Sequence, residues 1–407
     1  MRGRSPVIQT RRVTPLVLSA TPTRYRVAAA PATAPIPPFP VAMSRGPYQN
    51  NGASPWYANL TLGTPGQPLK IALDTGAAFI WVTSSLCAPT SCQHYSNGRF
   101  IYQNSSSFQW VNQNPKDVDF GPWGSMTVEV GQDNVAIAPG APMQLDMYLS
   151  SQYSGSQFAQ LDWDGGIGIP SGSDYADPST SFSIASLMND GLIDPSNPFI
   201  SFSSDATTGQ GTVLFGGVDG NGIDPESAIY MPWTPYTAFP NVKYIWATPL
   251  FSYYVGSTQV ATNVQFCLDS GSSQFKGDDN IMNETLGLIT QSPNLDVVMN
   301  VGLTADGEMG QIVVPPSVYN VTIQAGPDQG KTLPQFNPLG LTNLVLVGSV
   351  LMDQLYTVYV YDVVSTGDGY HLSPTGMYVF NKLDGPSLIK TRSKKPLTLA
   401  PRPVHRV

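Results

Sequence analysis

Residues 71–77 of the chain read IALDTGA, and residues 266–272 read FCLDSGS. In each copy an apolar run leads into an aspartate, a hydroxyl residue and a glycine, which is the pattern of a buried strand that ends in a tight turn. Each copy is followed later by apolar residues and a glycine, at 166–168 and at 346–348. Because the same frame occurs twice in the same order, we infer two similar halves with a site between them.

The repeated aspartates, Asp74 and Asp269, are the candidate catalytic residues. Two such turns that meet between the halves would let the carboxyl groups share one proton, since like charges in a desolvated site cannot both ionise at low cost. One carboxyl can then act as a base toward a bound water while the other donates a proton to the carbonyl group of a peptide bond. A single motif of this kind is an ordinary strand-to-turn signal, but its framed repetition argues against chance.

The residues next to the two aspartates are expected to support the pair. The hydroxyl groups of Thr75 and Ser270 can bond buried backbone groups that an alanine would leave without partners. The other predicted support residues are Gly76, Gly271 and Ser272.

Length and composition predict an all-β protein with two lobes. The chain has 407 residues, of which 41% are hydrophobic and only 12% are charged, and such a length favours two cores. Short β-branched or alternating runs lie between turn-rich clusters, at 69–73, 79–82, 127–130 and 212–215. A single helix is predicted over Ser183–Asn189, ended by Asp190 and Gly191.

The chain is expected to have four segments. Residues 1–50 form a largely disordered leader or prosegment, and residues 383–407 form a basic, disordered tail. Between them, residues 51–235 form an N-terminal β lobe with Asp74 and the flap, and residues 236–382 form a C-terminal β lobe with Asp269.

The formal net charge of −8 conceals a strongly acidic body. The stretch 46–381 holds six of the 20 basic residues and 27 of the 28 acidic residues, a formal balance of −21. Such a body is not expected to bind nucleic acid, which favours basic surfaces. Protonation of carboxylates in acid would relieve its self-repulsion. We therefore expect a protein of an acidic compartment, secreted or vacuolar, although no clear signal peptide is evident.

Cysteine and histidine are scarce. Cys87 and Cys92 lie in a turn-rich stretch and form either a disulfide or two free thiols, whereas Cys267 is expected to be a buried free thiol. The three histidines do not cluster, so we expect no metal and no cofactor. We also expect a monomer. No membrane span is expected, because no apolar run reaches 18 residues. Four sequons are compatible with secretion: Asn59, Asn104, Asn283 and Asn320.

Over about residues 54–380 the chain resembles the pepsin family of aspartic endopeptidases. The similar stretches follow the family's order, at 57–65, 74–82, 164–169, 211–219, 313–319 and 345–348. The resemblance implies a bilobal all-β fold, a substrate cleft between the lobes, and cleavage of peptides between bulky apolar residues in acid. It also implies a small disulfide loop closed by Cys87 and Cys92, and places in the cleft for Trp81 and Ile167.

The flap, a hairpin that closes over substrate in this family, departs from the family pattern. The usual Tyr-Gly-x-Gly is matched by Phe120, Gly121, Pro122, Trp123 and Gly124, so the phenol is missing. Either the indole N–H of Trp123 substitutes for it, or the ring packs as an apolar lid. We expect weaker catalysis or altered specificity.

Two further departures lie beside the aspartates. Ala77 stands where the family most often has a hydroxyl that bonds the first aspartate, and the loss of this donor is expected to raise the pKa of Asp74. Ser272 keeps the equivalent hydroxyl beside Asp269. Ser349 replaces an aspartate that is common in the family, with a modest effect expected.

Two rival functions stay open. A non-catalytic pepsin-like binding or inhibitor protein is favoured by the missing flap tyrosine and opposed by the two retained aspartates. A glycosidase would require Asp74 and Asp269 to lie well apart in a sugar cleft. Other acidic pairs lack the strand-and-turn frame and are interpreted as solvated turn residues: Asp162 with Asp164, and Asp278 with Asp279.

Overall fold

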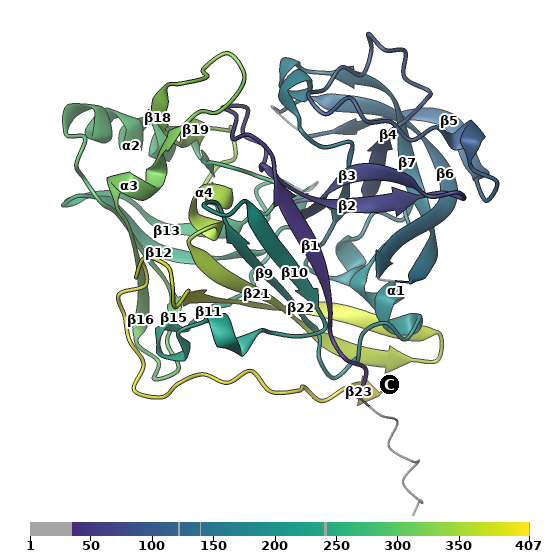
Figure 1. Ribbon diagram of the computed structural model, residues 1–407. Coiled ribbons are helices and arrows are strands. Elements are labelled where there is room, and N and C mark those ends of the chain that lie inside the picture. Colours follow the sequence, from purple (N-terminus) through teal and green to yellow (C-terminus); the bar gives the residue numbers. More distant parts are fainter. Residues whose placement is uncertain (1–34, 121–122, 139, 240–241, 407) are drawn as a thin grey trace, which may run out of the picture. The chain divides into compact units, whose positions relative to one another are not determined.

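The apolar runs of the sequence form the strands of a mostly β structure. The computed structural model describes residues 35–120, 123–138, 140–239 and 242–406, and Figure 1 shows their arrangement. The predicted leader therefore lies outside the described residues up to residue 34, as do Gly121 and Pro122 of the predicted flap. The described body falls in one compact unit, Ile36–Val407.

The N-terminal half is a set of strands with one short helix. Each predicted run at 69–73, 79–82 and 127–130 falls in or next to one of these strands. The elements are β2 (Trp56–Leu62), β3 (Gln67–Asp74), β4 (Ile80–Thr83), β5 (Gln109–Asp119), β6 (Ser125–Ala138), β7 (Ala141–Ser154), β8 (Gly165–Gly168) and α1 (Ile184–Asn189).

The predicted helix is confirmed, beginning at Ile184 with Ser183 as its N-cap and ending at Asn189 as expected. The side chain of Ser183 accepts from the backbone N–H of Ser186, and Ser186 returns a bond to the backbone N–H of Ser183, which is a capping box. At the other end Asp190 is the C-cap, and Gly191 follows with φ +70°.

The C-terminal half repeats this organisation with more helix. Its elements are β12 (Ala247–Val255), β13 (Thr258–Leu268), β14 (Phe275–Gly277), α2 (Asp279–Gln291), β15 (Val297–Leu303), β16 (Met309–Val314), α3 (Pro316–Tyr319), β17 (Asn320–Thr322), β18 (Thr332–Pro334), β19 (Phe336–Pro338), β20 (Leu344–Val347) and α4 (Ser349–Met352). Helix α2 was not expected from the sequence, although Asp278 caps it by accepting from the N–H groups of Asn280 and Ile281.

Strands from both halves pair between the two lobes. In Figure 1 these strands run between the blue strands of the N-terminal half and the green elements of the C-terminal half. They are β1 (Phe39–Arg45), β9 (Phe199–Asp205), β10 (Gln210–Phe215), β11 (Ile229–Pro232), β21 (Leu355–Thr366) and β22 (Gly369–Asn381). Strand β9 pairs with β10 and with β21, which joins the halves by backbone hydrogen bonds. The predicted run at 212–215 lies in β10, and the division at residue 235 stays a prediction.

The two repeated motifs occupy equivalent places in the sheet. Strand β3 pairs in parallel with β8, and β8 pairs antiparallel with β4. In the same way β13 pairs in parallel with β20, and β20 pairs antiparallel with β14. The apolar residues and glycine that follow each aspartate motif therefore form the strand that supports it, as the internal repeat predicted.

Two expectations about the ends of the chain are corrected. Residues 39–45, assigned to a disordered leader, form β1, which pairs with β10 and β2. The basic tail after residue 382, expected to be disordered, is ordered through residue 406 in the structure. Its last residues form β23 (His405–Arg406), which pairs in parallel with β21.

The tail is ordered because apolar residues inside it are buried and the acidic body supplies partners for its charges. Leu388 and Ile389 are only 2% and 0% exposed. Arg392 forms ion pairs with Asp224 and Glu226. Averaged composition hides two apolar anchors in a basic, proline-rich segment, and this is why the sequence suggested disorder.

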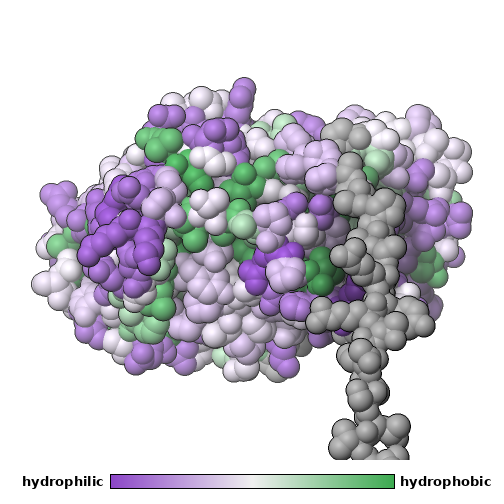
Figure 2. All heavy atoms as spheres, turned by 90° about the horizontal axis from the view of Figure 1, so that it is seen from below, coloured by the Kyte–Doolittle hydropathy of each residue, from purple (hydrophilic) through white to green (hydrophobic). Residues whose placement is uncertain are grey.

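The surface reflects the low share of charged residues. Seen from below, hydrophilic and hydrophobic residues both reach the surface, and hydrophobic ones gather toward the middle of this face (Figure 2). Such mixing is ordinary for a folded protein. Among the described residues no helix is long and apolar enough to cross a membrane.

Candidate active site

Asp74 and Asp269 end equivalent strands and make equivalent turns. We call residues 74–77 the Asp74 loop and residues 269–272 the Asp269 loop. The N–H of Gly76 donates to Oδ1 of Asp74 at 2.8 Å, and the N–H of Gly271 donates to Oδ1 of Asp269 at 2.9 Å. Each turn therefore holds its own carboxylate through the residue two positions later.

The hydroxyl residues lock the two loops together. The N–H of Thr75 donates to Oγ of Ser270 at 3.0 Å, and the N–H of Ser270 donates to Oγ1 of Thr75 at 3.0 Å. Each hydroxyl also donates to the opposite strand: Ser270 to the carbonyl of Leu73 at 2.6 Å, and Thr75 to that of Leu268 at 3.2 Å. The predicted bonding of buried backbone groups is thus realised across the two halves.

The glycines let each carboxyl group approach the opposite loop. A Cβ added at Gly76 would lie 2.4 Å from Oδ1 of Asp269, and one added at Gly271 would lie 2.3 Å from Oδ1 of Asp74. Both distances are below van der Waals contact, so the two carboxyl groups are enclosed by the crossed loops. The side chains of Asp74 and Asp269 are within hydrogen-bond reach of each other. They are therefore closer than the carboxyl groups of a glycosidase pair, which lie about 5 Å or more apart.

Burial and proximity favour the neutral form of Asp74. Burial is the largest cause that raises its pKa well above the ordinary range, and the charge of Asp269 and a hydrogen bond with it act in the same direction. The N–H of Gly76 and the charge of Lys276 oppose this rise. The pKa of Asp74 is thus raised, with burial as the leading cause, and the effect of the missing hydroxyl at Ala77 stays a prediction.

The two loops differ at their fourth residue. The hydroxyl of Ser272 donates to Oδ2 of Asp269 at 2.8 Å, as expected. Its counterpart Ala77 is buried and has no side-chain donor for the carboxyl group of Asp74; its backbone N–H donates to the carbonyl oxygen of Asp74 at 3.3 Å. Asp269 thus has two donors to its carboxylate, Gly271 and Ser272, whereas Asp74 has the N–H of Gly76.

The glycines of the supporting strands also have matching roles. A Cβ at Gly168 would lie 2.6 Å from the carbonyl oxygen of Ala77, and one at Gly348 would lie 2.1 Å from that of Ser272. Each supporting strand therefore needs glycine where it passes beneath the loop. Ser349, which follows Gly348, contributes its backbone N–H to the carbonyl of Ser272 at 2.8 Å.

The carboxyl pair opens into a cleft of about 380 Å³. Its walls are largely aromatic and aliphatic, with a few polar groups near the aspartates. The lining residues outside the two loops are Gly52, Ala53, Trp81, Asp119, Phe120, Trp123, Trp163, Phe239, Val242, Tyr244, Ile245, Lys276, Leu339, Gly340, Leu341 and Leu346. A mostly apolar cleft with convergent polar groups is typical of a binding site.

Of the two predicted cleft residues, Trp81 and Ile167, one lines the cleft and the other does not. Trp81, on β4, lines the cleft. Ile167, on β8, does not, because it is 0% exposed and packs in the core beneath the Asp74 loop. The expectation for Ile167 is corrected: it pairs with Leu73 and with Ile80, between the two strands of the motif.

The described part of the flap supports the packing role of Trp123 and not the replacement of the phenol, because its indole N–H is bonded to Asn51 rather than to Trp81. Its indole N–H donates to the carbonyl of Asn51 at 3.0 Å, and its ring packs against Phe158 at 4.5 Å between centroids. Phe120 lies 6.4 Å from Trp81 between ring centroids. The N–H of Phe120 donates to the carbonyl of Gly124 at 2.8 Å, which closes the hairpin tip.

The disulfide between Cys87 and Cys92 is present, and Cys267 is a buried free thiol.

Three of the four acidic residues interpreted as solvated are buried, namely Asp162, Asp164 and Asp278, whereas Asp279 is exposed. Asp164 is 3% exposed and accepts from Nε2 of His94 at 3.0 Å. Burial alone would raise the pKa of Asp164, but the hydrogen bonds with His94 and with the N–H of Lys70 lower it below its ordinary value. His94 and Lys70 are distant from Asp164 in the sequence, so no local pattern could identify this buried carboxylate.

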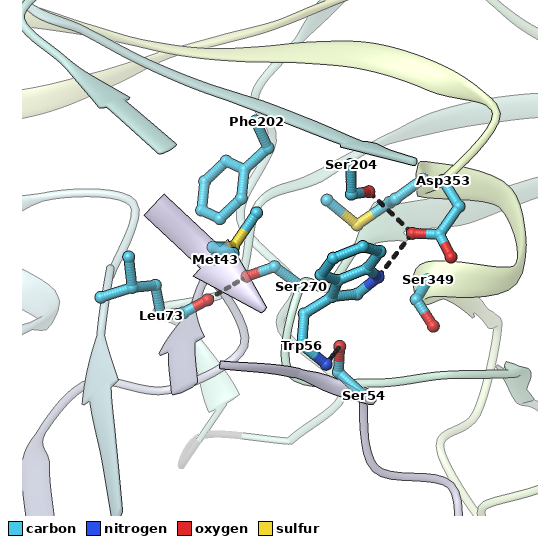
Figure 3. A pocket seen from close by; sticks show the side chains of 10 residues that line it. Met43, Ser54, Trp56, Leu73, Phe202, Ser204, Ser270, Ser349 and Asp353 are labelled. Carbon is cyan, nitrogen blue, oxygen red and sulfur yellow. Dashed lines mark hydrogen bonds between the residues drawn. The ribbon is translucent and has the colours of Figure 1, made fainter. Parts of the chain in front are cut away.

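Behind the loops lies a small cavity of about 20 Å³, shown in Figure 3 with the bond from Ser270 to Leu73. Asp353 accepts there from Nε1 of Trp56 and from the hydroxyl of Ser204, both at 2.7 Å. Burial raises the pKa of Asp353. This carboxyl is a scaffold group, because its partners belong to β2 and β9 and it does not line the cleft.

Three charged or hydroxyl-bearing residues of the cleft were not expected from the sequence: Asp119, Tyr244 and Lys276. Burial raises the pKa of Tyr244, and the charges of Asp74 and Asp269 raise it further. A signal for Lys276 existed, because it lies seven residues after Asp269 in a stretch with only six basic residues.

Comparisons with known proteins agree with this geometry. The family model "Eukaryotic aspartyl protease" matches residues 55–367. Pepsin A of Canis lupus familiaris is 26% identical over 348 residues, covering 81% of this chain and 84% of the relative. Pepsin A of Rhinolophus ferrumequinum is 27% identical over 333 residues, covering 78% and 81%. Chymosin of Bos taurus is 26% identical over 330 residues, covering 77% and 80%.

Proposed function

Because this chain belongs to the eukaryotic aspartyl protease family, we propose that it is an aspartic endopeptidase whose catalytic pair is Asp74 and Asp269. The observation that carries the proposal is the crossing of the two loops, which brings both carboxyl groups to the floor of one cleft. Neither aspartate could be replaced by a neutral residue without loss of the shared proton.

The proposed reaction uses the asymmetry of the pair. Asp74 holds the proton, since burial and its neighbour raise its pKa, and Asp269 carries the charge, since it accepts from Gly271 and Ser272. Asp269 takes a proton from the attacking water while Asp74 donates its proton to the carbonyl oxygen of the peptide bond. The water oxygen bonds to the carbonyl carbon, which gives a gem-diol intermediate. Asp269 then passes its proton to the nitrogen while Asp74 takes back a proton from one hydroxyl, so that the C–N bond breaks, an amine and a carboxylic acid leave, and the pair returns to its starting state.

The walls of the cleft support a preference for apolar peptide side chains. The N-terminal half of the chain contributes Trp81, Phe120 and Trp123 to these walls. The C-terminal half contributes Leu341 and Leu346. Burial of such side chains contributes about 25 cal/mol per Å². We therefore propose cleavage between bulky apolar residues.

We further propose an acidic working compartment, secreted or vacuolar. The formal balance of −21 over residues 46–381 supports it. Three of the four sequons, Asn59, Asn104 and Asn283, are exposed and accessible to glycosylation. A monomer is proposed as the working form.

The decisive experiment is digestion of a denatured protein in acid. We expect cleavage by the wild type, inhibition by a statine-type mimic of the transition state, and a fall in kcat of about 10³-fold or more for Asp74→Asn and Asp269→Asn. Asp353→Asn is the matched control, because it alters a buried carboxyl outside the cleft while retaining an oxygen acceptor.

The rival function is a non-catalytic binding or inhibitor protein. Replacement of the flap tyrosine by Phe120 is the observation that favours it. A folded wild type that binds the statine-type mimic but cleaves no peptide would favour the rival and contradict the proposed endopeptidase.

A further inference from the structure

Lys276 occupies an unusual place for a lysine. It lies on β14, is 4% exposed, and lines the same cleft as Asp74 and Asp269. Burial of an ammonium group is unfavourable unless polar partners and charges compensate for the lost water. The surroundings of Lys276 must therefore supply such partners.

The contacts of the ammonium group lead directly to the Asp269 loop. Nζ of Lys276 donates to Oγ of Ser272 at 3.1 Å and to the carbonyl oxygen of Gly52. The Ser272 hydroxyl in turn donates to Oδ2 of Asp269 at 2.8 Å. A continuous chain of hydrogen bonds thus runs from the lysine through the serine to one carboxylate of the pair.

Gly52 is held against the same loop. The N–H of Ser273 donates to the carbonyl oxygen of Gly52 at 3.0 Å, and the N–H of Ser54 donates to that of Gly271 at 2.8 Å. The segment between β1 and β2 thus closes over Lys276 from the side opposite β14. The lysine is fixed by backbone that is itself bonded to the loop.

The sheet register identifies the counterpart of Lys276 in the other half. Lys276 pairs with Leu346 of β20, as Trp81 pairs with Gly166 of β8. Each residue follows its aspartate by seven positions, and both line the cleft. The internal repeat therefore places an indole on one side of the pair and a cation on the other.

The charged groups that act on Lys276 are the two aspartates. Burial, the largest effect, lowers the pKa of Lys276 to about 8, and Asp269 and Asp74 raise it. Asp119 and Tyr244 line the same cleft, from β5 and from the segment before β12. Lys276 therefore carries a positive charge throughout the acidic range in which the pair is proposed to work.

We propose that Lys276 is a positioning residue that polarises the Ser272 hydroxyl and thereby assigns the negative charge of the pair to Asp269, leaving the proton on Asp74. A hydroxyl that accepts a bond from an ammonium group is a stronger donor to a carboxylate. The asymmetry of the proposed mechanism then depends on a residue outside both Asp-hydroxyl-Gly motifs. This inference rests on the proposed function.

The first test is the pH profile of kcat/KM for Lys276→Met. Loss of the cation destabilises the anionic pair, so the pKa values of the pair rise and the whole profile moves to higher pH by about one unit. Ser272→Ala interrupts the chain in its middle and is expected to shift the profile in the same direction. Lys276→Met should then shift the profile less in the Ser272→Ala background than in the wild-type background.

Lys382→Met is the matched control. Lys382 is also a largely buried lysine whose pKa burial lowers to about 8, but its ammonium group donates to the carbonyl oxygens of Ser204 and Asp353. It does not line the cleft, so its loss should leave the pH profile in place. An equal shift in Lys382→Met would show a general charge effect and overturn the inference.

A second readout does not need activity. Carbon NMR of labelled aspartates follows the titration of the pair, and its midpoint should rise by about one pH unit in Lys276→Met. An unchanged titration overturns the role of Lys276 even if the wild type is a protease. If the wild type cleaves no peptide but the titration still shifts in Lys276→Met, the result supports the role of Lys276 and contradicts the proposed function instead. If Lys276→Met does not fold, Ser272→Ala decides in the same assays.

Discussion

The Asp74 loop and the Asp269 loop have the same backbone but different chemistry. Both are held by the N–H of the glycine two residues later, and both lie above a supporting strand that needs glycine. Asp269, however, has the Ser272 hydroxyl and the cation of Lys276 behind it, whereas Asp74 faces Ala77. A nearly symmetric scaffold thus gives its two carboxyl groups different neighbours.

The largest expected effect comes from breaking what the loops share. Gly271→Ala and Gly76→Ala each place a methyl group about 2.3–2.4 Å from the opposite carboxylate, so the pair must separate. Because a displacement of about 1 Å can reduce a rate by about 10²-fold, we expect losses of that size in kcat. Steady-state cleavage of a peptide in acid measures them.

Gly287→Ala is the control for the glycine variants. Gly287 lies within α2, and an added Cβ there meets nothing within 4 Å. We expect unchanged kcat and a gain in unfolding free energy of about 0.5–1 kcal/mol. Wild-type activity in Gly271→Ala would contradict the crossed arrangement of loops and carboxylates.

The next effect tests the difference between the loops. Ala77→Ser restores to Asp74 the donor that Ser272 gives to Asp269, and a donor to the charged form lowers a carboxyl pKa. The pair should then ionise at lower pH, so the acid limb of kcat/KM moves down by about half a unit. Peptide cleavage between about pH 2 and pH 7 measures this shift.

Ser272→Ala is the opposite change and should move the acid limb upward. If Ala77→Ser raised the limb, or if both variants moved it in one direction, the assigned roles of the two fourth residues would be wrong.

The smallest effect concerns the flap, which belongs to the N-terminal half alone. Phe120→Tyr returns a phenol near Trp81, whose ring centroid lies 6.4 Å from that of Phe120. We expect a change in kcat/KM of about twofold or more, equivalent to about 0.4 kcal/mol. Phe251→Tyr, on an exposed ring outside the cleft, should have no effect. A smaller change in Phe120→Tyr would mean that the aromatic packing of Trp123 already supplies what the phenol does elsewhere.

Local patterns were sufficient for the elements of the site. The strands before Asp74 and Asp269, the turns, the supporting strands and the capped helix at 184–189 all depend on neighbours within a few residues. Periodicity, turn residues and caps report such contacts directly. Composition averaged over a long segment was misleading, because the basic, proline-rich tail was predicted to be disordered although Leu388 and Ile389 are buried. The 13-residue helix α2 was also missed despite its cap.

Contacts between distant residues were decided by the tertiary structure. Ile167 was expected in the cleft but is buried, because β8 inserts between β3 and β4. Asp164 was expected in solvent but is buried against His94.

The sequence by itself determined the repeat, the all-β class and the two aspartates, because each is a property of consecutive residues. The sequence also shows one difference between the aspartates, Ala77 against Ser272. Only the tertiary structure brought Lys276 behind Asp269 and enclosed both carboxyl groups between crossed loops. The physical reason is that a carboxyl pKa depends on burial and on neighbouring charges, which are set by packing across almost 200 residues of chain.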